Sequence, residues 1–289
     1  ISNITHMSDT IILTRYLYVA DEVVYSLLQS IIEGTEFKEC VFWCCELYYS
    51  GFHDKLWQFI FEFYYNFSAI THPKYERKLS KIHTEFCKNN SLNQILTAIT
   101  MLFYTKKNYK IFSLWLKTPS IPNKTYVGRN PKWYNNLNID TKYKNLVRSI
   151  HAENWHNVIF YLKYYPADET YEVIRSYFQS VYNYKLKQKN LADIPYNDKQ
   201  HIVFTLIFYL LIDENEIQKK AIFRSYDHDI YEVGIKESCL PVQPVYKTLP
   251  EKLKYPIKNS IGCFPLARYN LKNITLKELY WYHWEYCCY

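Results

Sequence analysis

Residues 21–51 read DEVVYSLLQSIIEGTEFKECVFWCCELYYSG and hold two apolar repeats that each end at a glycine. The apolar side chains of the first repeat recur at intervals of three and four residues, as on one face of an α-helix: Val23, Val24, Leu27, Leu28, Ile31 and Ile32. The second repeat has the same spacing in Phe37, Val41, Cys44 and Tyr48. Gly34 and Gly51 favour the left-handed conformation that ends a helix, and Asp21 and Thr35 can cap the two N-termini. The stretch therefore predicts two helices joined by a short turn.

The rest of the chain continues in this manner, so we expect a predominantly all-α fold. Helical spacing predicts further helices at about 56–67, 74–87, from 91 onward, and at about 143–152, 154–164, 168–186 and 198–213, and a short apolar element lies at 111–116. The chain has 5 Gly against 31 Tyr and 16 Phe, which favours packed helices over a β-sandwich or a nucleotide-binding α/β fold. Short connections predict antiparallel helical hairpins, which can stack as in a solenoid.

Two helical lobes are expected, at 7–117 and 141–289, joined by a linker at 118–140. The linker lacks a sustained helical period and contains residues that interrupt helices: Pro119, Pro122, Gly128 and Pro131. Within the C-terminal lobe, the five prolines of residues 239–270 predict an irregular segment that wraps over the helices. A terminal helix is expected to begin at Thr275, where Glu278 completes a capping box.

The eight cysteines and the apolar runs indicate a reducing, intracellular location. Adjacent pairs such as Cys44 and Cys45 are typical of buried thiols in helices rather than of a spaced disulfide framework. The N-terminus lacks the pattern of a signal peptide. The longest apolar run, residues 202–212, is too short to span a bilayer and predicts a core helix, so no membrane span is expected.

No set of residues predicts a catalytic site, a metal site or a cofactor. Cys40 and Cys44 share a helix face, but zinc needs four converging ligands. Cys87 and His83 lie one turn apart, yet inside a helix rather than at the N-terminus that would activate a thiol. A polar turn explains the cluster at 227–229 better than a divalent ion does, and no Gly-rich phosphate loop is present.

The charge is unevenly distributed along the chain. Residues 1–70 carry 3 basic and 9 acidic side chains, whereas residues 71–130 carry 11 basic and 2 acidic ones, so the net charge changes from −6 to +9. Basic residues interleaved with aromatic ones suit phosphates and unpaired bases. The candidate nucleic-acid-binding residues are Lys106, Lys107, Tyr109, Lys110, Arg129, Lys132 and Trp133. A second basic set, at 184–189, is interpreted as the C-terminal turn of a helix.

Several segments near the two ends of the chain resemble a known protein family. They are residues 15–18, 25–28, 39–43, 46–52 and 280–286, the last reading YWYHWEY. The chain resembles there an uncharacterised family encoded by nucleocytoplasmic large DNA viruses, the giant viruses. The resemblance implies a viral protein that works in the cytoplasm of the host cell, in the viral factory or in the virion. It carries no catalytic motif.

Three functional interpretations remain. The first is a viral scaffold or adaptor without catalysis that binds a protein partner, with Tyr and Trp as anchors on an exposed aromatic patch. The second is a helical protein that binds RNA or DNA through residues 71–133, which requires the candidate lysines to converge on one face. An enzyme of unknown class is third. The oligomeric state is left open.

Overall fold

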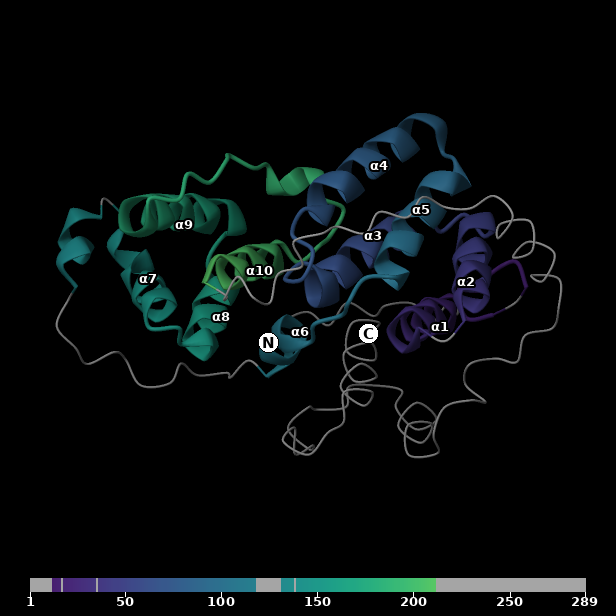
Figure 1. Cartoon of the computed structure of the whole chain (residues 1–289), viewed down its shortest axis with the longest axis horizontal. Helices are drawn as coiled ribbons and strands as arrows, with labels where there is room; N and C mark the ends of the chain where they lie inside the picture. Colours follow the sequence, from purple (N-terminus) through teal and green to yellow (C-terminus); the bar gives the residue numbers. More distant parts are fainter. Residues whose placement is uncertain (1–11, 17, 35, 118–130, 138, 212–289) are drawn as a thin grey trace, which may run out of the picture. The chain divides into compact units, whose positions relative to one another are not determined.

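The computed structural model describes residues 12–16, 18–34, 36–117, 131–137 and 139–211 (Figure 1). The described residues form ten α-helices and no strand, which confirms the all-α prediction. The α-helices are α1 Ala20–Glu33, α2 Phe37–Tyr49, α3 His53–Phe63, α4 Tyr75–Asn89, α5 Leu92–Phe103, α6 Lys110–Leu116, α7 Lys144–His151, α8 Trp155–Tyr164, α9 Ala167–Tyr182 and α10 Lys199–Leu211. The shorter elements are the π-helix η1 Tyr64–Ser68 and the 3-10 helices η2 Lys132–Asn136, η3 Thr141–Tyr143 and η4 Leu191–Asp193.

The described chain forms two compact units, and each is considered by itself. Unit 1 contains residues 12–56 and Ser91–Phe103, and unit 2 contains Trp57–Asn90 and residues 104–211. Unit 2 thus combines α4 and α6 with α7 to α10. Most of the expected linker, the proline-rich wrap at 239–270 and the terminal helix lie outside the described residues.

In unit 1, α1 packs against α2, and α5 packs against both. Gly34 has a φ of 62° and its N–H donates to the carbonyl oxygen of Ser30, so it ends α1 as its sequence position predicts. The capping role expected for Asp21 is wrong, because the helix begins at Ala20 and Val19 takes the cap position. Asp21 lies in the first turn and forms an ion pair with Lys55 instead.

In unit 2, the core surrounds α10 and η1. Helix α10 packs against α8, α9, α6 and η1, and Figure 1 shows it between α8 and α9. Its apolar side chains Val203, Phe204 and Ile207 are completely buried, so the apolar run forms a core helix as predicted. The helix expected at 56–67 changes to a π-helix at Tyr64, and Ala69 N–H bonds to Tyr64 O.

Helix α9 ends earlier than its periodicity predicts. The apolar spacing continues to Leu186, but Asn183 adopts a φ of 56° and ends the helix at Tyr182. Asparagine tolerates this left-handed conformation better than most residues do. Lys185 and Lys187 therefore follow the helix, and their interpretation as its last turn is wrong.

Candidate nucleic-acid interface

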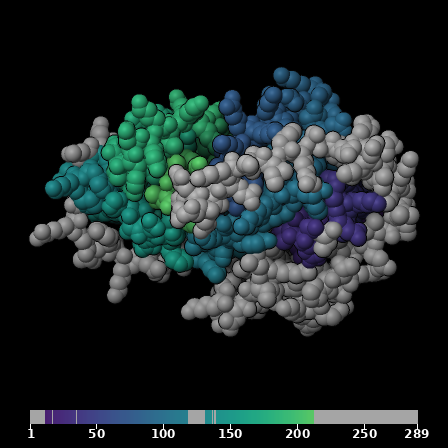
Figure 2. Space-filling model, in the orientation of Figure 1, coloured from purple at the N-terminus to yellow at the C-terminus, as the bar shows by residue number. Residues whose placement is uncertain are grey.

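One face of α4 carries a row of basic side chains. The row runs at intervals of three, four and seven residues, which places its members on the same side of the helix: Lys74, Arg77, Lys78, Lys81 and Lys88. The buried side chains of α4 lie on another face: Tyr75, Leu79, Ile82 and Phe86. This amphipathic division fixes the row toward solvent, and Figure 2 shows α4 in blue at the surface of the molecule.

The positive charges of the row are crowded. The side chain of Lys81 is 78% exposed. Partial burial and the neighbouring charge of Lys81 together lower the pKa of Lys78. Glu85 falls on the same face, where its carboxylate lies 3.9 Å from Lys81 Nζ. The other carboxylate of α4, on Glu76, forms an ion pair with Lys189. The row therefore keeps a strong positive potential.

The loop of residues 104–109 lies against the N-terminal end of α4. Thr71 Oγ1 donates to Lys106 O at 2.8 Å, and Asn108 N–H donates to Phe67 O at 2.7 Å. The side chains of Tyr75 and Thr105 share a hydrogen bond at the first residue of α4. These contacts hold the backbone of the loop beside the start of the basic row.

Four of the predicted residues belong to this loop or to the start of α6. Lys106 and Lys110 are exposed, and Lys107 is half-buried. Tyr109 packs its ring 5.9 Å from that of Phe67. The structure thus brings the backbone of this loop to the first turn of α4, where Tyr75 contacts Thr105. The basic residues of α4 were not among the predicted binding residues, although their helical spacing indicates that they share one face of the helix.

The remaining predicted residues lie elsewhere. Arg129 lies outside the described residues. Lys132 and Trp133 belong to η2, and the Trp133 ring centroid lies 4.9 Å from that of His151 and 5.4 Å from that of Tyr177. These contacts place η2 against α7 and α9, whereas the loop of residues 104–109 lies against η1 and α4.

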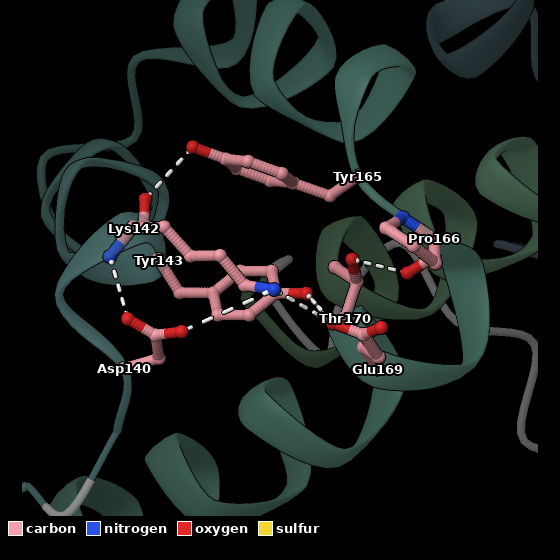
Figure 3. Close-up of polar contacts among 7 residues, drawn as sticks. All are labelled: Asp140, Lys142, Tyr143, Tyr165, Pro166, Glu169 and Thr170. Carbon is pink, nitrogen blue, oxygen red and sulfur yellow. Dashed lines mark hydrogen bonds and ion pairs between the residues drawn. The ribbon is translucent and has the colours of Figure 1, made fainter.

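A polar cluster joins η3 to the beginning of α9 (Figure 3). Glu169 Oε2 accepts hydrogen bonds from Tyr143 Oη at 2.6 Å and Lys142 Nζ at 2.9 Å, and these lower the pKa of Glu169. Tyr165 Oη donates to Lys142 O at 2.8 Å. The carboxylate already binds donors of the fold, so we assign the cluster to the positioning of η3.

Four of the cysteines lie in the described part of the chain, and three of these are buried. Cys40, Cys44 and Cys45 are buried thiols, and burial raises the pKa of Cys45 to about 12. Cys87 Sγ lies 3.6 Å from His83 Nε2, and the His83 ring packs against Trp57. Within the described part of the chain, no group of three or more His, Cys, Asp or Glu side chains could hold a metal ion. The cluster at 227–229 lies outside it.

Among the described residues, no helix combines the length and apolar character needed to cross a membrane. No family model, curated protein or solved structure matches the chain. The viral resemblance and the functional interpretations therefore stay predictions.

Proposed function

We propose that unit 2 binds nucleic acid through the basic surface formed by α4 and the loop of residues 104–109, together with Lys110. The observation that carries this proposal is the hydrogen bond from Thr71 to Lys106, which holds the loop beside the row of α4. In this proposal the two basic segments, which α5 separates in the sequence, act together on the phosphate backbone. Phosphate contacts from such a surface need no particular base sequence.

The dimensions of the row suit a phosphate backbone. Residues 74–88 of a helix that rises 1.5 Å per residue span ~20 Å. Over this length one strand of a duplex carries about six phosphates, at 3.4 Å of rise for each. Neutralising about five of them releases counterions, so a fourfold rise in salt weakens duplex binding on the order of 500-fold.

The test is a fluorescence anisotropy titration of labelled RNA and DNA, single-stranded and duplex, at salt concentrations from about 50 to about 200 mM. The Lys81→Glu variant removes a central charge of the row and is expected to weaken binding several-fold. Lys38→Glu makes the same charge change at an exposed position of α2 in unit 1 and is the matched control. Binding that is insensitive to salt, or equal loss in both variants, would contradict the proposal.

A charge-preserving variant tests whether the loss in Lys81→Glu comes from the missing cation rather than from disturbed folding. The double variant Lys81→Glu, Glu85→Lys exchanges two charges one helical turn apart on the same face of α4. We expect it to bind within about twofold of the wild type, since the phosphate contribution depends on how many cations the face presents. A loss as large as that of Lys81→Glu alone would point to disturbed folding.

A second candidate function is the scaffold interpretation, and an exposed patch of unit 1 favours it. The Arg15 guanidinium lies 4.6 Å from the ring centroid of Tyr16 and 4.7 Å from that of Tyr49, and these rings are 46% and 43% exposed. Ile12 and Leu13 are exposed beside them in sequence. Tyr and Arg are frequent anchors of protein interfaces. If wild-type protein binds no nucleic acid, partner searches with a Tyr16→Ala variant become the next test.

A further inference from the structure

A contiguous set of aromatic rings joins η2 to the end of α9. The Trp133 ring lies 5.4 Å from that of Tyr177, which lies 5.8 Å from that of Tyr182. Tyr182 in turn stacks on Tyr184 with centroids 6.0 Å apart and an interplanar angle of 25°. The rings therefore pass continuously from the buried Tyr177 to the exposed Tyr184.

The left-handed conformation of Asn183 creates this arrangement. It turns the chain back at the end of α9, so that Tyr184 N–H donates to Phe178 O at 3.1 Å. The Tyr184 ring then lies almost parallel to that of Phe178, at an angle of 7°. Despite these contacts, Tyr184 stays 47% exposed and Tyr182 36% exposed. Both rings are held in position and remain accessible to a ligand.

The surroundings of these rings are basic. Lys132 is exposed next to Trp133, and Lys185 and Lys187 are exposed after Tyr184. On α7, Arg148 and Lys144 lie over the ring of Tyr134, at 4.4 and 5.1 Å from its centroid.

Acidic residues are scarce in the segments that carry these rings. The sequence has no Asp or Glu between 172 and 193, and none between 140 and 153. Cations beside accessible, fixed rings are the features that bind a single strand, because every base has a face that can stack.

We infer that Tyr182 and Tyr184, with the neighbouring Lys132, Lys185 and Lys187, form a stacking platform for the unpaired bases of single-stranded nucleic acid. This inference rests on the proposed function and names its ligand class. The row of α4 binds phosphates of any strand, whereas the platform needs bases that are free of a duplex. It therefore gives the protein a preference for single strands.

The test compares a labelled oligo(U) strand with an RNA duplex of the same length, each titrated with the full chain. Tyr184→Ala removes the exposed ring, and stacking is worth about 5-fold to about 140-fold per base. We expect about tenfold weaker binding of oligo(U) and duplex binding within about twofold of the wild type. Tyr184→Phe keeps the ring and should retain affinity. Tyr164→Ala removes a ring that is 68% exposed on α8 and serves as the matched control.

The outcomes separate the two proposals. Equal affinity for oligo(U) and duplex, with Tyr184→Ala unchanged, overturns the platform and leaves the basic surface of α4 in place. Equal losses in Tyr184→Ala and Tyr164→Ala also overturn the platform. Absence of binding to either probe in the wild type overturns both proposals. Thermal unfolding of each variant identifies a loss caused by unfolding.

Discussion

The hydroxyl of Thr71 donates a hydrogen bond of 2.8 Å to the backbone carbonyl oxygen of Lys106, which lies 35 residues further along the chain. Thr71 is buried in the turn that follows η1, and its Oγ1 also lies 3.1 Å from Ser68 O. This one side chain therefore links the π-helix η1, the start of α4 and the basic loop. The backbone position of Lys106 is therefore held by a buried side chain of unit 2 rather than by contacts at the surface.

Replacing Thr71 by Val keeps the shape of the side chain and removes the hydroxyl. The carbonyl oxygen of Lys106 then loses a donor in a partly buried position, which costs about 1–3 kcal/mol. We expect a lower free energy of unfolding by this amount in urea titrations, and weaker RNA binding because the loop is less fixed. Thr71→Ser retains the hydroxyl and should behave as the wild type. Unchanged stability in Thr71→Val would contradict this role.

The sequence predicted local features of the fold and missed those that depend on distant contacts. Gly34 ends α1 because glycine adopts a positive φ at little cost, and this is visible in the sequence. The end of α9 at Tyr182 was missed, because Asn183 overrides an apolar period that continues beyond it. The hydrogen bond between Thr71 and Lys106 joins residues too distant for any periodic pattern to connect. The candidate site was therefore predictable as a basic region of the sequence, but the contacts that bring the loop to α4 were not.

Because the carboxylate of Glu46 is buried, removal of Arg15 is expected to lower the free energy of unfolding substantially. Arg15 Nε donates to Glu46 Oε2 at 2.8 Å, and the Glu46 side chain is completely buried. Arg15→Ala leaves a buried charge without its ionic partner and is expected to cost about 3 kcal/mol of unfolding free energy. Arg175→Ala removes the exposed pair with Glu172 and should cost less than about 1 kcal/mol. Similar costs for the two variants in denaturant titrations would contradict the burial of Glu46.

The polar cluster of Figure 3 predicts a dependence of stability on pH. The pKa of Glu169 is lowered in the folded state, first by the hydrogen bond from Tyr143. Its contribution to stability is therefore complete above the usual carboxyl pKa of 4.5 and is lost as the pH falls through the lowered value. The stability difference between wild type and Glu169→Gln should shrink as the pH falls below 4.5. A stability difference that grows on acidification would contradict the lowered pKa of Glu169.

The cysteines of the described residues predict a selective labelling pattern. Cys87 is exposed on α4, whereas Cys40, Cys44 and Cys45 are buried, and burial raises the pKa of Cys45 to about 12. Because the thiolate is the nucleophile, iodoacetamide at about pH 8 should label Cys87 rapidly and the other three only after unfolding. Peptide mass spectrometry distinguishes the positions. Rapid labelling of Cys45 in the native protein would contradict the packing of α2.

The most direct test of the central claim is ultraviolet cross-linking of the full chain to a single-stranded RNA, followed by mass spectrometry of the linked peptides. A basic surface on α4 and the adjoining loop predicts links to peptides from residues 74–90 and 104–110, which disappear at high salt and become several-fold weaker in the Lys81→Glu variant. Links confined to residues 12–56, or no links above those of a neutral control protein, would contradict the claim that unit 2 binds nucleic acid.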